Sequence, residues 1–124
     1  MPKKAPTVAG VLRKAYRLIS NEKRWTKGAY HIIRDGHDCY CSMGALNVSV
    51  NGDDQSGSAC GFIYPDRISV AHAALGHLQK AMWDVTGLTH RSVVVINDAP
   101  NTTHAQVKKA FRLAYTAAGG VGHP

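Results

Sequence analysis

Cys41 is a candidate thiol nucleophile in this sequence. It directly precedes residues 42–50, which we expect to form a short helix, and backbone N–H groups at the start of a helix can lower the pKa of a thiol. No recognised local signature of a cysteine enzyme surrounds it, so a small apolar residue packed at the foot of a helix is the competing interpretation. The residues that would complete a catalytic arrangement are His31, His72 or His77, together with Asn97 or Asp98.

Histidine and cysteine residues at alternate positions form a candidate zinc site. His37, Cys39 and Cys41 would point to one face of a strand, because strand side chains alternate between two faces. Cys60 would supply a fourth ligand, and this combination of thiolates with an imidazole suits zinc. The spacing differs from the usual C-x2-C and H-x3-H forms, and no second half-site accompanies it. Three reduced, partly buried thiols are the competing interpretation.

Residues 1–27 carry a concentrated positive charge. They contain eight Lys or Arg side chains and one acidic residue, Glu22, whereas seven basic and seven acidic side chains balance over the rest of the chain. Clustered cations of this kind bind phosphate groups. No zinc-finger spacing, RNP-like motif or helix-turn-helix is evident, so binding would be salt-sensitive and weakly sequence-specific. A solvated face that keeps the protein soluble is the competing interpretation. The basic residues are Lys3, Lys4, Arg13, Lys14, Arg17, Lys23, Arg24 and Lys27.

A first helix would present many of these cations together. Thr7 is suited to cap a helix, and apolar residues recur from Val8 onward with helical spacing. We expect this helix to run to about Asn21. Residues 1–6 are expected to form a flexible basic arm, because their prolines and lysines disfavour regular structure. The side chains opposite the apolar face of the helix would be Arg13, Lys14 and Arg17.

Two short elements would hold the cysteines. Residues 29–33 and 39–41 are expected to pair as a β-hairpin across a turn at Asp35–Gly36. Residues 42–50 would follow as a short helix, although Gly44 weakens helix formation there.

The second half of the chain is predicted to be mainly helical. Its longest helix would begin near Asp66, a possible N-cap, and end at Gly87, a good C-terminal cap. Residues 92–96 are rich in β-branched side chains and fit either a strand or a buried helical turn. A capping box at Thr103 would start a final helix over residues 104–117.

The segment Asn97–Asp98–Ala99–Pro100 has a local structural explanation. Asn and Asp side chains bond nearby backbone in turns, and proline fixes the backbone ahead of a helix. The glycine-rich stretches 51–59 and 118–124 are expected to form an exposed loop and a flexible end.

Together these elements predict one domain over residues 1–124, with flexible ends at 1–6 and 118–124. Its fold class is α+β and mainly helical, with three main helices and a minor β-hairpin or short strands. No secretory signal or membrane-spanning run is evident, so we expect a cytoplasmic protein without a membrane association. The expected core contains Leu12, Ala15, Ile19, Leu46, Ala71, Leu75, Leu78, Met82, Val107 and Phe111.

Three short patches occur in a distinctive order. They are Trp25–Ala29 (W-x-x-G-A), Cys41–Leu46 (C-x-x-G-A-L), and Asn97–Pro100 followed by Thr103 (N-D-x-P-x-x-T). Over about residues 25–113, this order resembles a family of small uncharacterised proteins from actinobacteria and their phages. The resemblance implies such an origin and a mainly helical domain, and it implies no activity. The basic N-terminal segment is not part of the pattern.

We therefore expect a non-enzymatic accessory protein that needs no cofactor. It would bind through its basic N-terminal face to nucleic acid or to an acidic surface of a host protein. If it is phage-encoded, it would act in the host cytoplasm. The alternatives are a thiol hydrolase or transferase centred on Cys41 and a small zinc-stabilised domain.

Overall fold

The computed structural model describes residues 6–52, 59, 61 and 65–124. Within these ranges it is mainly helical, with a two-stranded antiparallel sheet, which confirms the predicted α+β class. Two short 3-10 helices, η1 (Glu22–Arg24) and η3 (Pro65–Arg67), precede β1 and α3. The main elements are α1 (Val8–Ile19), β1 (His31–Arg34), β2 (His37–Tyr40), α2 (Ser42–Asn51), α3 (Ile68–Thr86), α4 (Val93–Asp98) and α5 (His104–Ala117).

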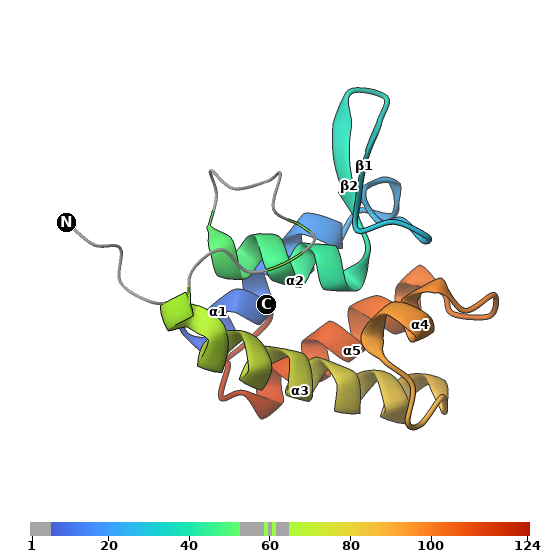
Figure 1. The fold of residues 1–124 in the computed structure, drawn as a ribbon. Helices are drawn as coiled ribbons and strands as arrows, with labels where there is room; N and C mark the ends of the chain where they lie inside the picture. Colours follow the sequence, from blue (N-terminus) through green and yellow to red (C-terminus); the bar gives the residue numbers. More distant parts are fainter. Residues whose placement is uncertain (1–5, 53–58, 60, 62–64) are drawn as a thin grey trace.

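The helices surround one hydrophobic core. α3 packs along α5, while α1 packs against both α2 and α5 (Figure 1). The hairpin projects from one end of this assembly beside α2 (Figure 1). Nine of the ten expected core residues are buried, and Leu75 is half-buried against the same cluster. Burial of apolar side chains from each α-helix therefore holds the elements together.

Specific caps fix the helix ends. The hydroxyl of Thr7 accepts the N–H of Gly10 at 2.9 Å, and Thr103 forms the predicted capping box with Gln106. Gly87 ends α3 with a φ of 76°, a left-handed conformation that favours glycine. The predicted cap at Asp66 is wrong, because Asp66 lies within η3 and α3 begins at Ile68 without a side-chain cap.

The hairpin forms around its predicted turn, but its second strand covers His37–Tyr40 rather than residues 39–41, and Cys41 caps α2 instead. His31 pairs with Tyr40 and Arg34 with His37, across a turn in which Asp35 and Gly36 have φ values of 53° and 75°. Two successive left-handed residues match the right-handed twist of the flanking strands.

Residues 92–96 belong to a helix. Ser92 caps α4 by accepting the N–H of Val95 at 3.3 Å. Val93 and Ile96 are buried three positions apart, while Val95 is half exposed. This burial has the period of a helix rather than the alternation of a strand. The ambiguity in the sequence is thereby resolved in favour of a buried helical turn.

Residues 118–124 pack back on the helices, whereas their glycine content predicted a flexible end. The hydroxyl of Tyr115 donates to the carbonyl oxygen of Val121 at 2.9 Å. Arg17 Nε donates to the carbonyl oxygen of Pro124 at 3.0 Å, and the ring of His123 meets Tyr16 edge-on. These polar contacts anchor a glycine-rich segment that has few apolar side chains.

Most of the expected 51–59 loop, together with residues 1–5, lies outside the described residues. In the described part of the chain, no helix combines the length and apolarity that a bilayer crossing requires.

Candidate functional site

The three sequence patches meet at the buried side chain of Asn97, near the end of α4. Its Oδ1 accepts the indole N–H of Trp25 at 2.8 Å, and the N–H and hydroxyl of Ser42 at 3.0 and 2.6 Å. Its Nδ2 donates to the carbonyl oxygen of Thr26 and to Asp98 Oδ1, both at 3.0 Å. A buried amide bonded in this way ties together segments that are distant in the sequence.

Asp98 extends the same junction. Its Oδ1 also accepts the backbone N–H of Gly28 at 2.9 Å, and Gly28 has a φ of 83°. Beside it, Lys27 Nζ donates to the carbonyl oxygen of Ala99 at 2.6 Å. The local-turn interpretation of this segment is therefore corrected: its side chains are structural, but they bond chiefly to distant parts of the chain.

Gly44 allows α2 to approach the hairpin. A Cβ atom at this position would collide with the carbonyl oxygen of Tyr30. The N–H of Cys41 donates to that same carbonyl oxygen at 3.4 Å, which continues the hairpin contact to the start of α2. The glycine that weakens the helix by propensity is thus required by packing.

A small cavity of about 130 Å³ opens beside the junction. It brings together Cys41 and Asp98, two of the candidate catalytic residues. His72 does not line it; this histidine lies exposed on α3. No other histidine of the described residues lines the cavity either. The lining residues are Gly28, Ala29, Tyr30, Cys41, Val94 and Asp98.

Cys41 is only 2% exposed. Burial raises its pKa above the ordinary value, and the charge of Asp98 acts in the same direction. Hydrogen bonds from the start of α2, including the N–H of Gly44 at 3.3 Å from Sγ, lower the pKa by less. A thiol with a raised pKa is protonated at neutral pH and is a poor nucleophile. These surroundings favour the interpretation of Cys41 as a small residue packed at the foot of a helix.

The candidate zinc ligands have separate environments. Cys39 is fully buried, and its thiol donates to the carbonyl oxygen of Lys23 at 3.2 Å. His37 is exposed at the hairpin turn, whereas Cys41 faces the small cavity. Cys60 lies outside the described residues. Within the described ranges, no three His, Cys, Asp or Glu residues are grouped to hold a metal ion.

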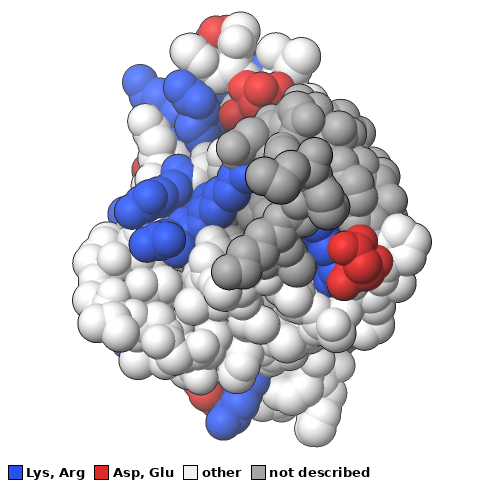
Figure 2. Space-filling model, turned by 90° about the vertical axis from the view of Figure 1, so that its left-hand side faces the viewer, with Lys and Arg blue, Asp and Glu red and all other residues white. Residues whose placement is uncertain are grey.

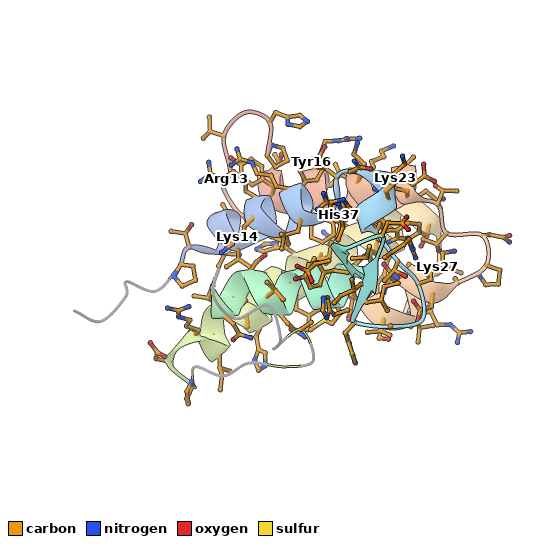
Figure 3. All side chains as sticks on the ribbon, turned by 90° about the horizontal axis from the view of Figure 1, so that it is seen from above. Arg13, Lys14, Tyr16, Lys23, Lys27 and His37 are labelled. Atoms are coloured by element: carbon orange, nitrogen blue, oxygen red, sulfur yellow. The ribbon has the colours of Figure 1, made fainter. Side chains whose placement is uncertain are left out.

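The predicted basic residues fall into two groups. Figure 3 shows Arg13 and Lys14 along α1 and Lys23 on η1, the element that follows it. Arg17 and Arg24 belong to these same two elements. Lys27 lies apart from them, because its ammonium group is bonded within the Asn97 junction. Lys3 and Lys4 lie outside the described residues.

Helix α5 adds cations that the charge distribution along the sequence did not associate with α1. Lys108 Nζ lies 6.0 Å from the ring centroid of Tyr16, and Arg112 Nη1 donates to the Tyr16 hydroxyl at 3.5 Å. His104 at the start of α5 donates from Nε2 to the carbonyl oxygen of Ile19 at 2.7 Å. Lys108 and Arg112 were not among the predicted basic-face residues, because their position next to α1 depends on helix packing.

We define the basic surface as seven cations drawn from α1, η1 and α5. Space-filling Figure 2 shows Lys and Arg side chains gathered on one side of the face that it presents. A hollow of about 370 Å³ lies where α5 meets η1, and Glu22 is its one acidic lining residue. The members of the basic surface are Arg13, Lys14, Arg17, Lys23, Arg24, Lys108 and Arg112.

These features define a small helical domain with a polar junction inside and a basic surface outside. The chain belongs to a family of unknown function, DUF6197, whose model matches residues 3–117. This membership confirms the expectation of an uncharacterised family. No curated protein and no solved structure matches the chain.

Proposed function

We propose that the protein binds nucleic acid by contacting phosphate groups with its basic surface. The observation that carries this proposal is that Lys108 and Arg112 of α5 lie against Tyr16 on the cation-rich helix α1. The same two cations line a hollow in which Glu22 of η1 is the one acidic lining residue. Lys108 and Arg112 are separated from α1 by most of the chain, yet both contact Tyr16. Like charges repel, and an anionic backbone relieves that repulsion by neutralising several cations at once.

Several cations of this surface are available to a ligand. The side chains of Arg13, Lys23 and Arg24 have no hydrogen-bond or ion-pair partner among the described residues. Others are held in place: Arg17 by Pro124, and Arg112 by the Tyr16 hydroxyl. A surface that combines free cations with oriented ones suits phosphate groups, since guanidinium groups bind phosphate oxygens through paired N–H donors.

The proposed activity is binding without catalysis. The protonated thiol of Cys41 and the exposed position of His72 give no support to a cysteine enzyme. No element of the described chain resembles a base-reading motif, so recognition would depend on the phosphate backbone. The resemblance of the three patches supports an origin in an actinobacterium or its phage, and the cytoplasmic accessory role is part of the proposal.

Fluorescence anisotropy tests this proposal. A labelled DNA duplex and an RNA hairpin would be titrated with the wild type and with Arg13→Gln/Lys108→Gln. The control, Lys80→Gln/Arg91→Gln, removes the same charge from exposed positions outside the basic surface. We expect the surface variant to bind about tenfold more weakly than the control at low salt.

Two results would count against the proposal. Equal weakening of the two variants would show that net charge alone matters. No binding of either nucleic acid at low salt would exclude the proposed ligand, and an acidic protein surface would then be the partner to test.

A further inference from the structure

A second basic hollow lies between η1 and the hairpin turn. Its volume is about 310 Å³. Two of its cations come from η1, whereas Arg34 and His37 come from the hairpin and were not included in the predicted basic face. Three permanent cations therefore face one carboxylate. The lining residues are Asn21, Lys23, Arg24, Arg34, Asp35 and His37.

Hydrogen bonds between η1 and β2 hold the two walls of this hollow together. The thiol of Cys39 on β2 donates to the carbonyl oxygen of Lys23 at 3.2 Å. Directly after η1, the N–H of Thr26 donates to the carbonyl oxygen of Tyr40 at 3.0 Å. These contacts join η1 to β2, so the backbone positions that carry the cations keep their spacing without a ligand. Cys39 therefore helps to hold η1, one wall of the hollow, against β2.

The donors at the hollow suit a tetrahedral oxyanion. Arg34 Nη2 donates to the hydroxyl of Thr26 at 3.3 Å, which orients the guanidinium group and leaves further N–H donors. Asn21 Oδ1 accepts the N–H of Lys23 at 3.0 Å, and its amide nitrogen remains a donor. His37 contributes an imidazole at the turn. Figure 3 shows His37 and Lys23 on adjoining elements of this region.

We infer that this hollow binds a phosphate group. The η1 residues Lys23 and Arg24 belong to the basic surface as well. The bound phosphate is therefore one phosphate of a nucleic-acid backbone that continues across α1 and α5. In that form the inference rests on the proposed function. A free phosphate ion offers the same oxygen atoms, and the two sources are separated by experiment. The single carboxylate of Asp35 leaves the lining with excess positive charge.

A chemical-shift titration with sodium phosphate tests the hollow directly. Sodium chloride at matched ionic strength is the reference. In the wild type and in Lys80→Gln/Arg91→Gln, we expect saturable shifts of the backbone amides of Arg24, Arg34 and His37. In Arg24→Gln/Arg34→Gln the saturable shifts would disappear, while the remaining spectrum would show the same fold. Shifts that are linear and spread over the whole surface would overturn the inference.

A second experiment, with a labelled DNA duplex, distinguishes a nucleic-acid phosphate from a free phosphate ion. For a labelled duplex, Arg24→Gln/Arg34→Gln should reduce the slope of log K against log salt by about 0.9 for each phosphate that the variant no longer neutralises. Saturable phosphate shifts without duplex binding would refute the proposed function and retain the hollow as a site for free phosphate. If the variant binds the duplex with an unchanged slope of log K against log salt, the hollow does not contact the nucleic acid. The proposed function would stand and this inference would fail.

Discussion

The indole N–H of Trp25 donates to Asn97 Oδ1 at 2.8 Å and joins the two halves of the chain. The same oxygen accepts two hydrogen bonds from Ser42 at the start of α2. Three donors therefore depend on one buried acceptor. Without it, the polar groups of buried Ser42 and the partly buried indole N–H would lose their acceptor.

Replacing Asn97 with alanine should lower the free energy of unfolding by about 2–4 kcal/mol. The reason is that the N–H and hydroxyl groups of Trp25 and Ser42 would lose their acceptor. Urea unfolding followed by circular dichroism measures this change. Asn101→Ala is the control, since Asn101 is exposed and its side chain has no partner in the described chain. A decrease below about 1 kcal/mol for Asn97→Ala would contradict the role of the junction.

Gly44→Ala should destabilise the fold by about 2–3 kcal/mol, because the added methyl group meets the carbonyl oxygen of Tyr30. Gly76→Ala is the matched control on α3. At Gly76 a Cβ meets nothing within 4 Å, so the helix propensity of alanine should stabilise the protein by about 0.5–1 kcal/mol. Thermal unfolding compares the two variants. Equal effects would show that α2 does not approach the hairpin closely.

Cys41 should react slowly with iodoacetamide at neutral pH. Burial raises the pKa of its thiol, and the residue is 2% exposed, so both the thiolate fraction and access are low. Mass spectrometry of peptides would follow labelling in the native protein and in urea. We expect labelling of Cys41 to become at least about tenfold faster in urea. Rapid stoichiometric labelling of the native protein would instead support the cysteine-enzyme alternative.

Stability should fall as the pH rises above about 9, the ordinary pKa of a thiol. Burial raises the pKa values of both Cys41 and Tyr40 in the folded protein. The unfolded chain therefore releases these protons at a lower pH than the folded chain, and proton release favours unfolding. Urea unfolding from neutral to alkaline pH measures the trend.

The control for the alkaline trend is Cys41→Ser/Tyr40→Phe, which lacks both titrating groups. Its free energy of unfolding should decline less steeply with pH than that of the wild type. Identical slopes for the two proteins would show that neither group contributes to alkaline destabilisation.

Local sequence signals predicted much of the fold. The caps at Thr7, Gly87 and Thr103 depend on residues within one helical turn, and the Asp35–Gly36 turn specifies the hairpin by itself. Residues 92–96 were ambiguous because β-branched propensity favours a strand. Packing against the core decides in favour of a helix, which buries Val93 and Ile96 together.

The candidate sites were less accessible to sequence reasoning, because they depend on long-range contacts. The sequence identified Asn97 and Asp98 as turn residues and did not indicate their bonds to Trp25, Thr26 and Gly28. Likewise, Lys108 joins the basic surface only because α5 packs beside α1. The one sequence signal for this junction was the occurrence of the three patches together, since residues from all three meet at Asn97.

The salt dependence of DNA binding is the decisive test of phosphate recognition by the basic surface. The dissociation constant of the wild-type protein for a labelled duplex would be measured between about 50 and 200 mM NaCl. Several phosphate contacts predict a slope of log K against log salt of about −3 or steeper. Absence of binding at the lowest salt, or an affinity that does not change with salt, would contradict phosphate recognition by the basic surface.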